Sequence, residues 1–384
     1  MSCGTDVLIF VEDPGAANYI APLPAELAQK GWQVSLLAGG NARNYLLARG
    51  VHSEEVQHPA TAGSILATYH PRLVLVGTSE NPDTLGLALV AQARRLEIPS
   101  VGVVDFYSNA GQRFRGQSRE ALTYAPDWLL LPDEWTRAAY VDLGYPAQRT
   151  AVCGHPHYDH ILQVKSQLDR KDPAILRRSI LPQSPEGRPV VVFVAEVSTG
   201  LNPQQYLRSP EYTLTGWGTS VGRTEIVLEE FLDAIRLVAP RPYLVLRLHP
   251  KNALEDFAPY LCEFDHVSSG GSPLELVYVS DLVVGMTSML LFEATLLGCQ
   301  TLSIVPREVE KEWLPSIHMH ITTCVTTREQ LRSKMTALVD DGAKGTHRGV
   351  YPIIAEALPR VVAFITTILK HEAVSRSEQK EIEP

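Results

Sequence analysis

Residues 280–298 read SDLVVGMTSMLLFEATLLG, an apolar run that passes through two hydroxyl side chains into an apolar helix pattern. Continuous apolar runs such as DLVVGM are typical of strands that are buried on both faces of a parallel sheet. Thr287 and Ser288 follow the run, and serine commonly caps a helix N-terminus. The helix pattern holds a single charge, Glu293. The stretch therefore predicts one strand–turn–helix unit of an α/β protein.

The same alternation of strand and helix patterns extends on both sides of this unit. In the first half it begins with the strand pattern DVLIFVE at residues 6–12, continues with a helix pattern from Asn18 to Lys30, and ends at RTAVCG. A second series begins at PVVVFVAEV, residues 189–197, and includes YLVLRLHP, HVSSG, DLVVGM and QTLSIVP. We therefore predict two doubly wound, Rossmann-like α/β domains that face each other across a cleft.

Changes in composition set the domain boundaries. Charges and prolines cluster in QVKSQLDRKDP and LPQSPEGRP, which indicates a linker, and the segment from Ser198 to Arg223 is a long stretch with little periodicity. A loop of that length is usually functional or disordered. The predicted parts are an N-terminal Rossmann-like domain (1–155), a linker (156–187), a C-terminal Rossmann-like domain (188–350), a helix that packs back towards the N-terminal domain (351–373) and a polar tail (374–384).

The bulk composition restricts the class of protein. The 384 residues carry a net charge of -9, which argues against nucleic acid as a partner because phosphate binding needs a basic face. The five cysteines are scattered without a pair motif, as is typical of reduced thiols in a cytoplasmic protein. No apolar run reaches the ~18 residues of a membrane span, and no basic amphipathic helix indicates membrane association.

The turn at Thr287 and Ser288 is the first candidate site. A helix N-terminus presents free N–H groups and the positive end of the helix dipole, which together favour an anion such as a diphosphate. Glu293 lies about one and a half turns further on, where a carboxylate could accept hydrogen bonds from ribose hydroxyls. The alternative is a plain N-cap followed by a glutamate on a solvated stripe.

Two other strand patterns of the second series end in charged residues. YLVLRLHP places Arg247 and His249 on one face, with Lys251 just beyond. A histidine near a phosphate can donate a hydrogen bond or transfer a proton, although it can also be an ordinary loop residue. Glu196 follows VVVFVA, where a carboxylate is costly unless it is paired. It is either a base or an ion-pair partner of Arg223 or Arg247.

The first domain offers a turn of small residues after its first strand pattern. Residues 12–18, EDPGAAN, let the backbone approach a ligand closely, and Asp13 and Asn18 are candidates for contacts to an acceptor or a sugar. Asp105 has a similar position after SVGVV. The turn is not a G-x-G-x-x-G dinucleotide fingerprint, so a tight strand–helix turn without a ligand is the alternative.

The histidines of CGHPHYDHIL do not indicate a metal site. His155, His157 and His160 match no strong zinc spacing, and no cysteine pair accompanies them. The sequence also lacks the P-loop, G-x-S-x-G and H-E-x-x-H motifs. We therefore expect chemistry that does not depend on a metal ion.

Four segments, taken in order, resemble the GT-B superfamily of nucleotide-sugar enzymes. They are the turn DPGAAN, the segment VCGHPHYD, the segment LRLHP, and the block SDLVVGMTSMLLFEATLLGCQTLSI. VCGHPHYD is similar to the G-x-P-x-x-D of GT-B glycosyltransferases and UDP-N-acetylglucosamine 2-epimerases, and LRLHP to the HP motif of capsule-type, sialyl- and glycerophosphate transferases. The last block is similar to the one that binds the nucleotide diphosphate and ribose, except that Gln300 stands in place of the usual proline.

The resemblance implies a distribution of roles between the domains. The N-terminal domain would take the acceptor, with Asp13 as the catalytic base, and the C-terminal domain would take the nucleotide-sugar. Ser288 would contact the phosphate and Glu293 the ribose, while His249 would contact the phosphate or the leaving group. The expected catalytic residues are Asp13, His249 and Glu196, and the expected nucleotide-binding residues are Arg247, Lys251, Thr287, Ser288 and Glu293.

The leading hypothesis is a cytoplasmic, metal-independent glycosyltransferase that transfers a sugar from a nucleotide-activated donor to a glycan, lipid or small-molecule acceptor. The nucleotide-sugar is a co-substrate, and no further cofactor is expected. Two alternatives stay open: a nucleotide-sugar epimerase or hydrolase, which needs no acceptor, and a GT-B-like binding or regulatory protein without turnover.

Overall fold

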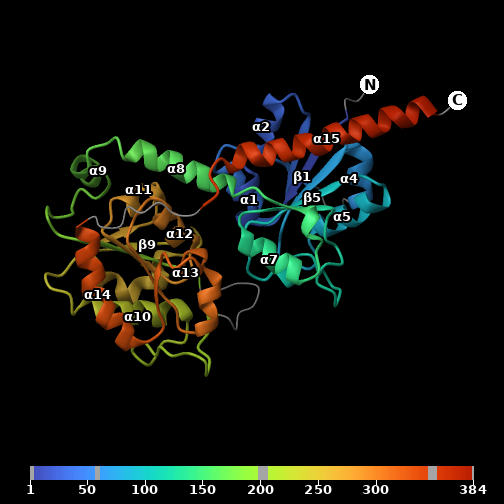
Figure 1. Ribbon diagram of the computed structural model, residues 1–384. Helices are drawn as coiled ribbons and strands as arrows, with labels where there is room; N and C mark the ends of the chain where they lie inside the picture. The colour runs from blue at the N-terminus through green and yellow to red at the C-terminus, as the bar shows by residue number, and fades with distance from the viewer. Residues whose placement is uncertain (1–3, 57–60, 198–205, 345–352, 383–384) are drawn as a thin grey trace. The chain divides into compact units, whose positions relative to one another are not determined.

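The computed structural model describes residues 4–56, 61–197, 206–344 and 353–382, with residues 372–382 described by their backbone alone. The chain divides into two compact units (Figure 1). Residues 1–160 and 353–384 form the first, here called the N-terminal domain, and residues 161–352 form the C-terminal domain. The first part of the predicted long loop, residues 198–205, lies outside the described residues.

The N-terminal domain is built on a parallel sheet, as predicted. Within the described residues the sheet has seven strands in the order β3-β2-β1-β4-β5-β6-β7. All of its strand pairs are parallel. The strands are β1 (Val7–Val11), β2 (Val34–Ala38), β3 (Glu54–Glu55), β4 (Leu73–Gly77), β5 (Ser100–Val103), β6 (Trp128–Leu131) and β7 (Thr150–Val152).

Helices cover both faces of this sheet, because alternate residues of a strand point to opposite sides. In β1, Ile9 packs into the cluster that also receives α2 and α15, whereas Phe10 packs with α4 and α5 on the other face. The α-helices are α1 (Pro14–Ile20), α2 (Leu23–Gln29), α3 (Gly40–Leu47), α4 (Ala62–Tyr69), α5 (Leu85–Arg95), α6 (Ala110–Arg113), α7 (Glu134–Asp142) and α15 (Ala357–Ile382), and η1 (Ala147–Arg149) is a 3₁₀ helix.

The prediction of a single helix from Asn18 to Lys30 is wrong. The structure has two shorter helices here, α1 and α2, with Pro22 at the N-cap of the second. Proline has no N–H group and its ring crowds the preceding turn, so a helix that arrives at Pro22 ends and a new one begins.

The C-terminal domain repeats the architecture on a parallel sheet. Among the described residues this sheet has six strands in the order β10-β9-β8-β11-β12-β13. They are β8 (Val190–Val194), β9 (Tyr243–Arg247), β10 (His266–Ser268), β11 (Leu282–Gly285), β12 (Thr301–Ile304) and β13 (Thr323–Val325). The prediction of two Rossmann-like α/β domains is therefore confirmed.

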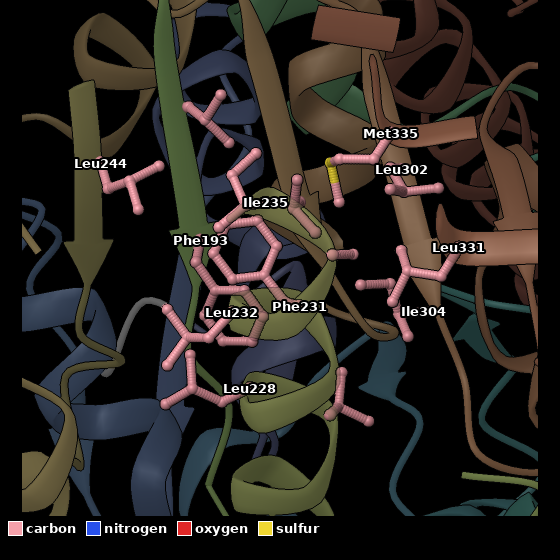
Figure 2. Close-up of a cluster of buried hydrophobic side chains, with 14 of the residues drawn as sticks. Phe193, Leu228, Phe231, Leu232, Ile235, Leu244, Leu302, Ile304, Leu331 and Met335 are labelled. Atoms are coloured by element: carbon pink, nitrogen blue, oxygen red, sulfur yellow. The ribbon is translucent and has the colours of Figure 1, made fainter. Parts of the chain in front are cut away.

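The core of this domain lies between the sheet and two long helices. Phe193 of β8 packs against Phe231 of α10, with ring centroids 5.1 Å apart, and Leu331 and Met335 of α14 close the same cluster (Figure 2). The α-helices of this domain are α9 (Pro173–Ile180), α10 (Arg223–Ile235), α11 (Pro273–Tyr278), α12 (Met289–Leu296), α13 (Pro315–His318) and α14 (Arg328–Ala343), the 3₁₀ helices are η3 (Leu254–Glu263) and η4 (Glu308–Trp313), and the division between the domains falls inside α8 (Pro156–Leu168).

Strand order places one switch point in each sheet. In a doubly wound sheet, ligands bind at the carboxyl ends of the strands where the order reverses. The order reverses between β1 and β4 in the N-terminal domain and between β8 and β11 in the C-terminal domain. The residues that follow these four strands are therefore the places to look for a site.

The C-terminal helix belongs to the N-terminal domain. α15 places Val361, Ile365 and Leu369 in the same cluster as β1, and the guanidinium of Arg72 donates to the carbonyl of Leu369 at 2.8 Å. The helix runs to Ile382, past residue 373, where the sequence pattern changes to a polar tail. Within the described ranges, none of the helices has the length and apolar character needed to cross a membrane.

Candidate functional site

A buried ion pair lies beside the switch point of the N-terminal domain. Asp105 follows β5 and its Oδ1 accepts a hydrogen bond from Nη1 of Arg113 at 2.7 Å and from the hydroxyl of Thr78 at 3.1 Å. Thr78 follows β4, and Arg113 is 6% exposed at the end of α6. The guanidinium is fixed by a further bond from its Nε to the carbonyl of Ser108 at 3.1 Å. This arrangement holds one carboxylate and its counter-charge at the carboxyl edge.

Gly15 explains why the turn after β1 consists of small residues. A Cβ atom on Gly15 would lie 2.1 Å from Oδ2 of Asp105. No side chain is tolerated at that distance, so glycine lets the start of α1 approach the Asp105 carboxylate. The DPGAAN turn thereby brings Asp13, at the N-cap of α1, next to the ion pair.

Asp13 has the electrostatics of an acid–base group. Burial, followed by the nearby carboxylate of Asp105, raises the pKa of Asp13 to about 6, although the guanidinium of Arg113 acts in the opposite direction. A carboxyl group that titrates near the working pH can both give and take a proton. Asp13 therefore lies in the environment that its predicted catalytic role requires, and the role itself stays a prediction.

The other polar residues of this edge contact one another. Glu12 accepts hydrogen bonds from the amide of Asn81 at 2.6 Å and from the hydroxyl of Thr84 at 2.5 Å. Asn18, a candidate for sugar contacts, accepts a hydrogen bond from the hydroxyl of Tyr45. A ligand at Asn18 would have to share that oxygen with Tyr45.

The switch point of the C-terminal domain is arranged differently. The Oε1 atom of Glu196, just after β8, accepts hydrogen bonds from the backbone N–H groups of Thr287 and Ser288, both at 2.6 Å. Ser288 caps α12, since its hydroxyl accepts from the N–H of Leu290 at 3.3 Å. The N–H groups that we predicted to meet a phosphate are thus bonded to a carboxylate of the chain itself.

An ion-pair network continues from Glu196 into the domain. Arg223 donates from Nη1 to Glu196 at 2.9 Å and from Nε to Glu310 at 2.7 Å, and Arg307 donates from Nε to Glu310 at 2.6 Å. Arg223 is 1% exposed and Glu310 is fully buried. Burial opposes the charge of Arg223, but the two carboxylates outweigh it and raise its pKa. Two acids and two arginines therefore neutralise each other, and the ion pair of Glu196 with Arg223, one of the predicted alternatives, is present.

Arg247, at the end of β9, and His249, just after it, have different partners. Arg247 donates to the hydroxyl of Ser268 at 2.9 Å and to the carbonyl of Gly270, which lie on or beside the neighbouring β10. His249 is half-buried and its Nδ1 accepts from the backbone N–H of Lys251 at 3.1 Å. Burial and the charge of Lys251 lower the pKa of His249, while Glu196 acts in the opposite direction. His249 is thus held in its neutral form near pH 7.

Glu293 lies in α12 and is half-buried, as its position in an apolar helix predicts. The structure does not test its ribose role, nor the phosphate roles of Arg247, His249, Lys251 and Ser288. These assignments stay predictions.

His155 belongs to an aromatic stack. Its ring lies 4.8 Å from that of Tyr19 and 4.5 Å from that of Tyr158, measured between centroids. Burial lowers the pKa of His155 well below its usual value. In the part of the chain that the structure describes, no group of three or more His, Cys, Asp or Glu side chains has the arrangement of a metal site.

Sequence reasoning missed three residues of these networks. Thr78 follows a strand without any motif, Arg113 is one of several arginines around a short helix, and Glu310 stands in the charged run EVEKEW, which is typical of a solvated face. No local pattern marks them. Only the strand order brings Thr78 beside Asp105, and only the fold turns Glu310 inward.

Similar solved structures show the fold. UDP-GlcNAc 2-epimerase from Neisseria meningitidis, solved with UDP-GlcNAc bound, is similar with a TM-score of 0.66 and 14% identity over 94% of this chain and 100% of that one. The fold is the GT-B fold. A putative UDP-N-acetylglucosamine 2-epimerase from Listeria monocytogenes is similar with a TM-score of 0.64 and 15% identity over 95% and 96% of the two chains.

A third solved structure also resembles the chain. Anabaena Alr3699/HepE in complex with UDP-glucose is similar with a TM-score of 0.57 and 13% identity over 97% of this chain and 99% of that one. No protein-family model and no curated protein matches the sequence. At these identities the likeness shows the fold, and the activity has to be argued from the site residues.

Proposed function

We propose that the chain is an enzyme that acts on a nucleoside diphosphate sugar as an epimerase or hydrolase, without a separate acceptor. The observation that carries this proposal is the acid–base environment of Asp13, whose pKa of about 6 suits proton transfer to or from a sugar. The likeness of the fold to UDP-GlcNAc 2-epimerases supports this reading over that of a glycosyltransferase.

The C-terminal domain would bind the nucleotide. The N–H groups of Thr287 and Ser288 and the guanidinium of Arg223 are donors that a diphosphate can use. In the structure Glu196 takes these donors, so we propose that the diphosphate binds by replacing its carboxylate. Glu196 would then be released from its ion pair only when an anion of the ligand takes its place.

The N-terminal domain would supply the proton-transfer step. Asp105 is bonded to the guanidinium of Arg113, whereas burial raises the pKa of Asp13, and the nearby Arg113 is already paired with Asp105. Two carboxyl groups whose environments differ in this way divide into an acid–base group and a fixed charge. Asp13 is the proposed acid–base residue, and Asp105 with Arg113 is the pair that tunes it.

The test is turnover without an acceptor. The purified chain is incubated in D₂O with UDP-GlcNAc and, separately, with UDP-glucose, and the products are followed by proton NMR. An epimerase gives the epimer with deuterium at the inverted carbon, and a hydrolase gives free UDP. Asp13→Asn should lower turnover by roughly 100- to 10,000-fold, because a general acid–base group contributes that much.

Asp142→Asn is the matched control, since Asp142 is exposed at the end of α7 and should leave turnover unchanged. Turnover that appears only when a glycan or lipid acceptor is added would establish the transferase instead. A UDP-sugar that binds and is never converted would establish the non-catalytic alternative.

A further inference from the structure

A cavity of about 500 Å³ lies in the C-terminal domain at the edge of the sheet opposite to Thr287 and Ser288. It lies between α9 and the loop that follows it on one side and the amino ends of β11 and β12 on the other. Ligand pockets of proteins occupy roughly 300–1,000 Å³, so a small molecule fits this space. The cavity is separate from the site proposed above, because residues at the amino end of β11 line it.

Three buried polar atoms around this cavity have no hydrogen-bond partner in the described part of the chain. They are Oε1 of Gln300, Nε of Arg177 and the hydroxyl oxygen of Ser184. Gln300 is 7% exposed. A buried polar group without a partner is costly, and native proteins contain few of them. All three belong to residues that line one cavity, where a bound molecule could supply the missing partners.

One further polar group of the wall is already satisfied. Asp281 pairs with the guanidinium of Arg177, and its Oδ2 also accepts from the backbone N–H of Val190 at 2.7 Å. The cavity therefore offers a ligand a donor from Arg177, a hydroxyl from Ser184 and an amide edge from Gln300. The wall also holds the carboxylate of Glu186 and several apolar residues, among them Leu181, Pro182, Val279 and Leu297.

The hydrogen-bonding pattern selects the ligand class. A side-chain amide pairs edge to edge with a flat ring that has adjacent donors and acceptors, as glutamine does with adenine. Apolar walls suit the faces of such a ring. Arg178 is exposed and lines the cavity beside Arg177, where a guanidinium can meet a phosphate. We propose that this cavity is a second ligand site, which binds the base of a mononucleotide at Gln300 and its phosphate at Arg178.

The experiment measures binding to the full chain. AMP, GMP, CMP and UMP, and the four corresponding nucleosides, are tested by thermal shift and the ligands that respond by calorimetry. A molecule that binds the native state raises Tm. At least one nucleotide should raise it, and Gln300→Leu should weaken its binding by roughly tenfold or more, as the loss of a buried hydrogen bond implies.

Two further variants keep the test independent of the Gln300 substitution. Arg178→Glu should weaken the nucleotide but not its nucleoside, and Ser184→Ala should weaken both. Neither position lies in the core, so both variants should fold even if Gln300→Leu does not. The effect of UDP-GlcNAc on Tm should be the same in all three variants, which separates this cavity from the site at Ser288.

The proposal is overturned if none of the eight compounds raises Tm. It is also overturned if a nucleotide binds all three variants as tightly as the parent chain, since the nucleotide then lies elsewhere.

Discussion

The two domains arrange the same kind of residues differently at equivalent edges. Each switch point has a carboxylate bonded to a buried arginine, Asp105 with Arg113 in one domain and Glu196 with Arg223 in the other. In the N-terminal domain one further acid, Asp13, stays beside the pair and has a raised pKa. In the C-terminal domain the acids and arginines are equal in number, and the carboxylate of Glu196 occupies the start of α12.

The difference shows how one fold can provide two kinds of chemistry. An edge with acids in excess raises the pKa of a carboxyl group towards neutrality, so it suits acid–base chemistry. An edge whose charges are matched is a stable framework, and under the proposed function it binds a ligand anion by exchange with Glu196. Four substitutions separate the two edges, and they are ordered here from the largest expected effect to the smallest.

Removing Arg223 should have the largest effect. Arg223→Met leaves Glu196 and the fully buried Glu310 without their shared counter-charge, which should lower the free energy of unfolding by about 3–5 kcal/mol. Arg236→Met is the matched control, because Arg236 is exposed and its pair with Glu263 should contribute less than about 1 kcal/mol. Urea denaturation measures both. Similar losses in the two variants would mean that the buried network is not a stabilising framework.

The excess acid of the N-terminal domain predicts a pH-dependent stability. Because the pKa of Asp13 is raised from 3.8 to about 6 on folding, the folded state binds the proton more tightly, and stability is lost as pH rises through that window. Asp13→Asn should therefore stabilise the protein above pH 6 by about 1–3 kcal/mol. At pH 4 it should have almost no effect. Denaturation at pH 4 and pH 8 tests the sign, and equal shifts at both values would contradict it.

Because the carboxylate of Glu196 occupies the N-terminus of α12, we expect its removal to increase the affinity for UDP. Glu196→Gln removes the negative charge that competes with a diphosphate for the N–H groups of Thr287 and Ser288. UDP should then bind roughly tenfold more tightly, a change similar to that of one charge-assisted hydrogen bond. Calorimetry with UDP measures it. Weaker binding would show that Glu196 contacts the ligand directly instead of competing with it.

We expect the smallest effect from the substitution of Glu293, which should change only the affinity for UDP. If it accepts a hydrogen bond from a ribose hydroxyl, Glu293→Ala should weaken UDP binding by roughly three- to tenfold and leave the fold intact. The same change should leave inorganic pyrophosphate, which has no ribose, unaffected. An unchanged affinity for UDP would show that Glu293 does not bind the ribose.

The sequence predicts the fold well wherever an apolar run is long enough to be seen. The buried strands β1, β8 and β11 are continuous apolar segments, and all were predicted. The strands β3 and β13, both at sheet edges, were not predicted, and β3 consists of Glu54 and Glu55, which form no apolar run. The break at Pro22 was available from the sequence, since proline interrupts a helix pattern.

The candidate site is less accessible from the sequence. Strand ends point to Asp13, Glu196 and Ser288, because ligands of such folds lie at the carboxyl edge. The electrostatics of these residues depend on partners that are distant in the chain. Arg113 bonds Thr78 across 35 positions, and Arg223 bonds Glu310 across 87. Only the three-dimensional arrangement shows that Glu196 occupies the helix terminus predicted for a phosphate.

The return of α15 to the N-terminal domain has a consequence for synthesis on the ribosome. Val361, Ile365 and Leu369 complete a core whose strands are translated first, and the whole C-terminal domain is translated in between. Domains fold as units while the chain grows. A nascent chain that has emerged as far as residue 352 therefore holds every strand of both sheets, yet only the second domain is complete. The N-terminal domain cannot complete its core until α15 is translated, and until then the apolar surface beside α2 stays exposed.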